Sequence, residues 1–192
     1  SSPWTSPLHA RKVNGFSKDT LPNYLLLVNS YYLTAVGITV LALKKVMGFC
    51  TDEQYKQFMA TVNEFESLLV GSDIQLIKYY LDITKEEQAI RLNDRAKDPL
   101  KQWKISPIDQ QAQKMWKAYS IARDDMLKHT SSKIAPWTVI SANEKKLAHL
   151  NLIADLLSRV DYPEKNKKLL KIDPMIILRW PTNTKKLPKL SQ

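Results

Sequence analysis

Five cationic side chains between residues 91 and 104 have the spacing to bind a row of phosphate groups. They are Arg91, Arg95, Lys97, Lys101 and Lys104. Phosphoryl transfer needs cations that neutralise the moving group and close over it, and a basic helix followed by a basic loop suits that chemistry. The alternative is a solvated helix face and loop without a ligand, which is the ordinary meaning of such a run.

A strand and a helix are predicted to position these cations. Residues 74–83 alternate as a β-strand does, and Thr84 with Glu87 forms a capping-box pattern that starts a helix. Arg91 and Arg95 would then lie one turn apart on the same face of that helix.

Further elements are predicted on both sides. A capping box at Thr51 and Gln54 starts a helix that ends near Gly71, and residues 137–140 form a short strand. Ser106-Pro107 starts a helix that runs to about residue 128. A last helix begins near Asn143, and its expected packing face consists of Leu147, Leu150, Ile153, Ala154 and Leu157.

Two adjacent carboxylates, Asp124 and Asp125, could be an acid/base pair. Because Arg123 and Lys128 lie beside them, a set of ion pairs on the helix surface is the favoured interpretation.

The run from Thr84 to Asp109 resembles the polyphosphate kinase 2 family, in which a strand is followed by S-x-x-E-Q and then by D-P-L-K-x-W-K-x-S-P-x-D. The similarity begins at Val46-Met-Gly-Phe-Cys50 and continues through Ala135-Pro-Trp-Thr-Val139. It covers residues 45–162, so it leaves out the first 44 residues and the tail.

The resemblance implies an α/β fold, here a partial P-loop kinase-like sheet flanked by helices, with a helical lid. It implies reversible phosphoryl transfer between inorganic polyphosphate and a nucleotide such as ADP, GDP or ATP, with Mg²⁺ bridging the phosphates. A homo-oligomer is expected, whereas a nucleic-acid or membrane partner is not. The lid positions that match the family are Arg91, Arg95, Lys101 and Lys104.

Two parts that this reaction needs do not occur in the sequence. There is no G-x-D-x-x-G-K-G loop, and Gly15, Gly37, Gly48 and Gly71 are not clustered, so a backbone cradle for phosphate is missing. The Walker B aspartate is also missing in this reading frame. We therefore expect a truncated, catalytically incomplete form with no catalytic and no metal-binding residues of its own.

Residues 24–43 contain no charged side chain and are followed by Lys44 and Lys45. Such a run is long enough to span a bilayer. It supports an alternative function, that of a non-catalytic, membrane-anchored or polyanion-binding protein.

A shift of reading frame explains the same run better. When the last base of each codon from Leu33 to Lys45 is joined to the first two bases of the next, the permitted codons include those for D-R-S-W-Y-N-R-A-G-V-E-K. That is the segment that precedes V-M-G-F in the polyphosphate kinase 2 family. We therefore interpret residues 1–44 as an out-of-frame segment, residues 45–162 as the C-terminal part of the kinase domain, and residues 163–192 as a basic tail that docks in part.

Amino-acid composition constrains the possible partners and sites more loosely. The net charge of +10 implies a polyanionic partner without choosing among them. The single cysteine, Cys50, excludes an internal disulfide framework and favours a reducing cytoplasmic setting, and the three histidines, His9, His129 and His149, are too scattered to indicate a metal site.

The frameshift interpretation predicts the nucleotide sequence of codons 1–46. One inserted or deleted base before codon 45 should restore D-R-S-W-Y-N-R, and sequencing of the gene measures this directly. A gene in which no single-base change restores that motif would contradict the interpretation.

Overall fold

The computed structural model describes residues 32–34, 45–46, 48, 50–100, 102–104, 111, 113–181 and 190. Within them the α-helices are α2 (Asp52–Gly71), α3 (Lys85–Lys97), α5 (Trp116–Thr130) and α6 (Lys145–Arg159), with the short 3-10 helices η2 (Gln102–Lys104) and η3 (Lys167–Leu169). The strands are β1 (Tyr32–Thr34), β2 (Gln75–Asp82), β3 (Trp137–Ser141) and β4 (Ile177–Arg179).

The four strands form one sheet in the order β1-β2-β3-β4. β1, β2 and β3 are parallel, and β4 is antiparallel to β3. The strands predicted at residues 74–83 and 137–140 are confirmed as β2 and β3. β4 comes from the segment predicted as a basic tail, where three residues are too few to show an alternating pattern.

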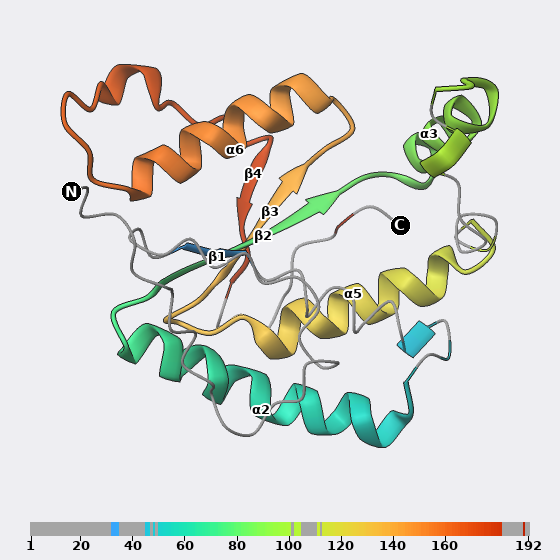
Figure 1. Ribbon diagram of the computed structural model, residues 1–192, viewed down its shortest axis with the longest axis horizontal. Helices are drawn as coiled ribbons and strands as arrows, with labels where there is room; N and C mark the ends of the chain where they lie inside the picture. The colour runs from blue at the N-terminus through green and yellow to red at the C-terminus, as the bar shows by residue number, and fades with distance from the viewer. Residues whose placement is uncertain are drawn as a thin grey trace, which may run out of the picture.

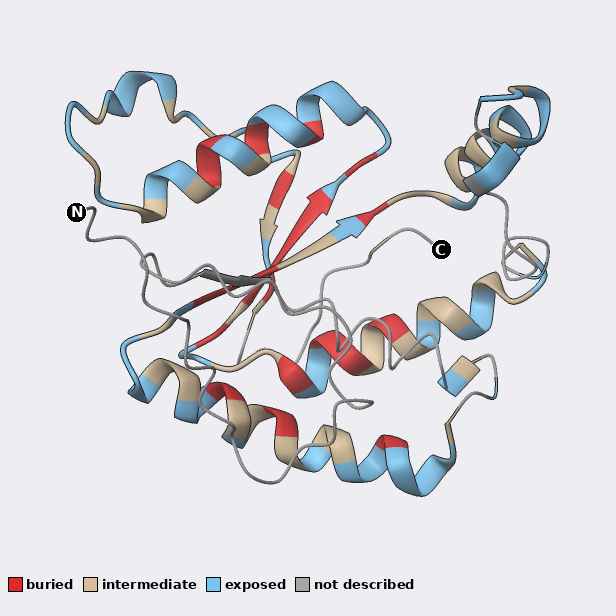
Figure 2. Ribbon diagram, viewed as in Figure 1, coloured by how far each residue is buried: buried red, intermediate tan, exposed pale blue. Residues whose placement is uncertain are grey.

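Helices cover both faces of this sheet. α2 and α5 lie against one face and α6 lies against the other, so the buried residues concentrate on the strands and on the inner sides of these helices (Figures 1 and 2). α3 lies beyond the end of β2, away from both helical layers (Figure 1). The α/β class predicted from the sequence is confirmed.

The capping box predicted for α2 is present. Thr51 Oγ1 accepts a hydrogen bond from the backbone N–H of Gln54 at 3.2 Å, and Gln54 Oε1 accepts one from the N–H of Thr51 at 2.9 Å. The two bonds satisfy donors that a helix start would otherwise leave free, which fixes the point where α2 begins.

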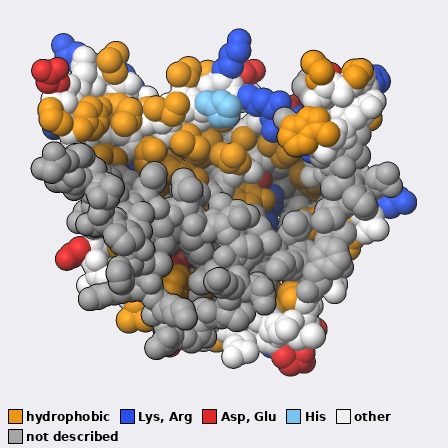
Figure 3. All heavy atoms as spheres, in the orientation of Figure 1, with side chains coloured by type: hydrophobic (Ala, Val, Ile, Leu, Met, Phe, Trp, Pro, Cys, Tyr) orange, Lys and Arg blue, Asp and Glu red, His pale blue; other side chains and the backbone are white. Residues whose placement is uncertain are grey.

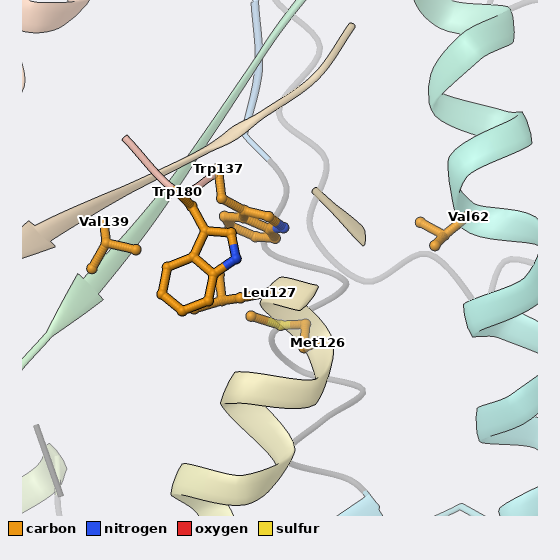
Figure 4. Close-up of a cluster of buried hydrophobic side chains, with 6 residues drawn as sticks. All are labelled: Val62, Met126, Leu127, Trp137, Val139 and Trp180. Carbon is orange, nitrogen blue, oxygen red and sulfur yellow. The ribbon is translucent and has the colours of Figure 1, made fainter. Parts of the chain in front are cut away.

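The main hydrophobic cluster lies between the sheet and the α2–α5 layer. Trp137, Leu127 and Met126 are at its centre, and Trp180, just after β4, completes it (Figure 4). Because Trp180 is only 2% exposed, the first part of the predicted tail contributes to the core.

Lys78 is wholly buried on the same face of the sheet. Its Nζ donates to Glu66 Oε2 of α2 at 2.8 Å and to the carbonyl oxygen of Thr130 at the end of α5 at 2.5 Å, and it lies 5.1 Å from the centre of the Trp137 ring. Burial raises the pKa of Glu66 and lowers the pKa of Lys78, because desolvation disfavours both charges; their mutual attraction opposes both shifts. The pair connects α2, β2 and α5.

Tyr79 points to the opposite face, because successive side chains of a strand alternate. Its hydroxyl donates to Asp155 Oδ2 of α6 at 2.5 Å, and burial together with this bond raises the pKa of Tyr79. Asp155 is completely buried and also accepts from Arg159 Nε at 3.0 Å and from Arg179 of β4. This network joins α6 to β2 and β4.

The prediction of which α6 residues face the core is largely wrong. Leu147, Leu150, Ile153 and Leu157 are 47%, 65%, 51% and 37% exposed, and of the predicted face only Ala154 is buried. Hydrophobic side chains accordingly gather on the surface along the upper part of Figure 3. The helix instead turns its small and polar residues inward, namely Ala148, Asn151, Ala154 and Asp155. The bonds of Asp155 to β2 and β4 require that rotation.

The single helix predicted from Pro107 to about residue 128 is wrong in its first part, because residues 113–115 form a turn and α5 begins only at Trp116. The predicted start at Pro107 lies outside the described residues. Asp124 pairs with Arg123 at 2.9 Å, whereas Asp125 lies against His129 at 3.0 Å and accepts a hydrogen bond from the Tyr55 hydroxyl at 3.0 Å. The two carboxylates therefore have separate partners. The expected ion pair of Arg123 is present, but Arg123 is buried and does not lie on the helix surface.

None of the described helices is both long and apolar enough to cross a membrane. Of the apolar run at residues 24–43, the structure describes Tyr32–Thr34, which form a strand. The rest of that run lies outside the described residues, and the out-of-frame interpretation stays a prediction.

The buried pair of Glu66 and Lys78 predicts that a single substitution destabilises the protein more than a double substitution. Glu66→Leu should lower the free energy of unfolding by about 3–5 kcal/mol, because it leaves the Lys78 ammonium buried without its carboxylate. Adding Lys78→Met should recover most of that loss, since both charges are then gone and the volume is kept. Urea unfolding measures both variants, and a double variant no more stable than Glu66→Leu alone would contradict the argument.

Candidate functional site

The carboxyl ends of β2 and β3 meet at one edge of the sheet, because the two strands are parallel and Asp82 is in register with Ser141. α3 and α6 begin at this same edge, after the caps Thr84 and Glu144. In open α/β sheets, ligands bind in the crevice outside the carboxyl ends of the strands. This edge is therefore the candidate functional site.

A buried ion pair lies at the end of β2. Asp82 Oδ1 accepts from Nη1 of Arg123 in α5 at 3.0 Å, and Arg123 Nε donates to Asp124 Oδ1 at 2.9 Å. Burial raises the pKa of the adjacent Tyr80 to about 12, and the charge of Arg123 opposes that rise. The pair holds the end of β2 against α5, so the carboxyl edge has a fixed position.

The sequence analysis placed Arg123 on the helix surface and did not find its buried pair with Asp82. A signal was present, since Arg123 lies four residues after Tyr119 and three before Met126, at helical positions expected to face the core. A charged residue at such a position needs a buried partner, and Asp82 at the end of a strand on that face is one.

The base of α3 is bonded to the connection between β3 and α6. The side chain of Thr84 accepts from the N–H of Glu87 at 3.2 Å, as the capping pattern predicted. The Glu87 carboxylate accepts from Arg91 Nε at 2.6 Å, and it is Asn143 Oδ1 that accepts from the N–H of Thr84, at 3.0 Å. One half of the predicted capping box is thus replaced by a bond from a distant loop.

Of the four predicted lid cations, the structure describes the side chains of two. Arg91 and Arg95 lie one turn apart on α3, and both are half-buried. Lys101 lies outside the described residues, as does the side chain of Lys104 at the end of η2. Arg91 and Arg95 are therefore brought to one helix face, while the gathering of all four stays a prediction.

The described side chains offer no ready-made cluster of metal ligands. Among the residues that the structure describes, no three histidine, cysteine or carboxylate groups converge on one point. The carboxylate nearest the end of β2, Asp82, is bonded to Arg123. No catalytic step at this edge is therefore assigned to Mg²⁺.

A comparison with known protein families identifies the family of this chain. A family model described as polyphosphate kinase 2 matches residues 29–168. The chain belongs to the polyphosphate kinase 2 family. The resemblance seen in residues 45–162 is confirmed, and the match to the polyphosphate kinase 2 model begins upstream of Lys45.

Individual polyphosphate kinase 2 relatives agree with this assignment. The chain is 44% identical over 137 residues to the NDP-polyphosphate phosphotransferase 2 of Ruegeria pomeroyi, covering 71% of this chain and 40% of the relative. It is 48% identical over 121 residues to the ADP-polyphosphate phosphotransferase of Pseudomonas aeruginosa, covering 63% and 40%.

Its structure is similar to the crystal structure of Polyphosphate Kinase 2 from Arthrobacter aurescens TC1. The TM-score is 0.56 at 32% identity, over 68% of this chain and 48% of that one. The chain thus spans less than half the length of these three polyphosphate kinase 2 proteins.

Proposed function

We propose that this chain is part of a polyphosphate kinase 2-type phosphotransferase and that it binds inorganic polyphosphate beneath a lid. The lid consists of α3, η2 and the loop between them, residues 85–104. The observation that carries the proposal is the place of α3, which begins at the carboxyl edge of β2 and lies beyond both helical layers (Figure 1). Arg91 and Arg95 lie one turn apart on this helix.

The charge of the lid supports a polyanionic ligand. Two arginines and two lysines over 14 residues can neutralise several phosphate groups at once, and the net charge of +10 favours the approach of a polyanion. The guanidinium of Arg91 is bonded within the protein through its Nε and Nη2 atoms. Arg95, Lys101 and Lys104 are the other lid cations at positions that match the family, and we propose that they contact phosphate.

The reaction that we propose is phosphoryl transfer between polyphosphate and a nucleoside diphosphate. The matched relatives are named NDP- and ADP-polyphosphate phosphotransferases, and this is the activity that family membership favours. Such transfer rests on a glycine-rich phosphate loop and on Mg²⁺ between the phosphates. Since this sequence contains no G-x-D-x-x-G-K-G segment, we assign to it the holding of polyphosphate and leave transfer to a protein that also carries that loop. A homo-oligomer is proposed on family membership alone.

Removing the lid cations should weaken polyphosphate binding and reduce its dependence on salt. In the variant Arg95→Ala, Lys101→Ala, Lys104→Ala, the slope of log K against log salt should fall by roughly one for each cation removed, as it does for cations that bind nucleic-acid phosphates. The melting temperature should barely change, because α3 has no buried residue. Titration with polyphosphate at several salt concentrations measures the slope.

Lys167→Ala, Lys168→Ala, Lys171→Ala is the matched control. These three exposed lysines carry the same charge, and η3 lies at the other end of the molecule from α3 (Figure 1). The control should keep the native salt slope. Equal decreases in the two triple variants would mean that net charge alone, and no lid, binds polyphosphate.

A further inference from the structure

Arg91 makes three hydrogen bonds at the base of the lid. Its Nε donates to Glu87 Oε1 at 2.6 Å, and its Nη2 donates to the carbonyl oxygens of Ala142 at 2.5 Å and Asn143 at 3.2 Å. The first bond lies within α3, whereas the other two reach the connection between β3 and α6. A planar guanidinium with fixed donor directions can serve both sides at once, which a lysine ammonium on a flexible stem does far less well.

The connection that Arg91 reaches is itself fixed. Ala142 is only 5% exposed and packs in a cluster with Ile140 of β3 and Ala148 of α6. Its N–H donates to the carbonyl oxygen of Asp82, the last residue of β2, at 2.7 Å. Arg91 is therefore bonded to a point where β2, β3 and α6 meet.

α3 is held mainly by polar bonds near its start. None of its residues is buried, and Leu92 is half-buried. The side chain of Gln113 donates to the carbonyl oxygen of Lys85 at 3.2 Å and to Gln88 Oε1 at 2.8 Å, both within the first turn of the helix. The bond from the N–H of Thr84 to Asn143 Oδ1 fixes the first residue of the lid. Arg91, two turns further along, supplies a second fixed point, and two points define the direction of a helix axis.

We propose that Arg91 is a positioning residue, which with Glu87 and the carbonyl groups of Ala142 and Asn143 forms a latch that sets the angle of the lid over the carboxyl edge. This inference rests on the proposed function of α3 as the polyphosphate lid. It assigns to Arg91 a role that its charge alone does not indicate, and it separates Arg91 from Arg95 one turn away.

Arg91→Lys decides between a latch and a phosphate contact, because it keeps the charge and removes the fork of donors. The latch predicts that Arg91→Lys and Arg91→Gln behave alike. In both, amide hydrogen exchange in residues 85–97 should rise roughly tenfold, because the bonds to the carbonyl oxygens of Ala142 and Asn143 are lost. Polyphosphate affinity should fall roughly tenfold at an unchanged salt slope. Exchange in α2 and α5 should not change, which shows that the fold is intact.

Arg95→Gln is the matched control on the same helix. It should lower the salt slope, because it removes one cation of the lid. The latch is wrong if Arg91→Lys keeps native exchange and native affinity while Arg91→Gln lowers the slope as Arg95→Gln does, since that is how a phosphate contact behaves. If the native chain does not bind polyphosphate, the proposed function fails, and the exchange rates of Arg91→Lys still decide the latch.

Discussion

The parallel pairing of β2 with β3 is the constraint on which the rest of the structure depends. It brings the carboxyl ends of both strands to one edge, so α3 and α6 begin side by side there. The alternation of side chains along β2 also sends Lys78 and Tyr79 to opposite faces, where each meets a buried carboxylate, Glu66 of α2 or Asp155 of α6. The helical layers are thus attached to the sheet by polar bonds as well as by apolar packing.

The lid and the core are stabilised by different interactions. α2, α5 and α6 all contain buried residues, whereas α3 contains none. A helix without a buried face is held by polar bonds near its base. Here they join Thr84 to Asn143, Arg91 to the β3–α6 connection, and the first turn of α3 to Gln113. Such a helix can change its angle without loss of core packing, which is what closing over a ligand requires.

The sequence predicted the elements with strong local signals and missed what depends on partners far along the chain. The caps at Thr51 and Thr84 and the alternation in residues 74–83 are local, and these predictions were confirmed. The predicted packing face of α6 was wrong, because Asp155 bonds to Tyr79 of β2 and to Arg179 of β4, and no local pattern reveals these partners. The buried pair of Arg123 with Asp82 and the bonds of Arg91 to backbone carbonyls were missed for the same reason.

Amide hydrogen exchange of the native chain with and without polyphosphate is the most direct test of the central claim, that the lid at the carboxyl edge holds the polyanion. The account predicts that added polyphosphate slows exchange in residues 85–104 and in the connection at Ala142 and Asn143, and leaves α2 and η3 at their original rates. Protection confined to the basic residues after Tyr162, with residues 85–104 unchanged, would contradict it.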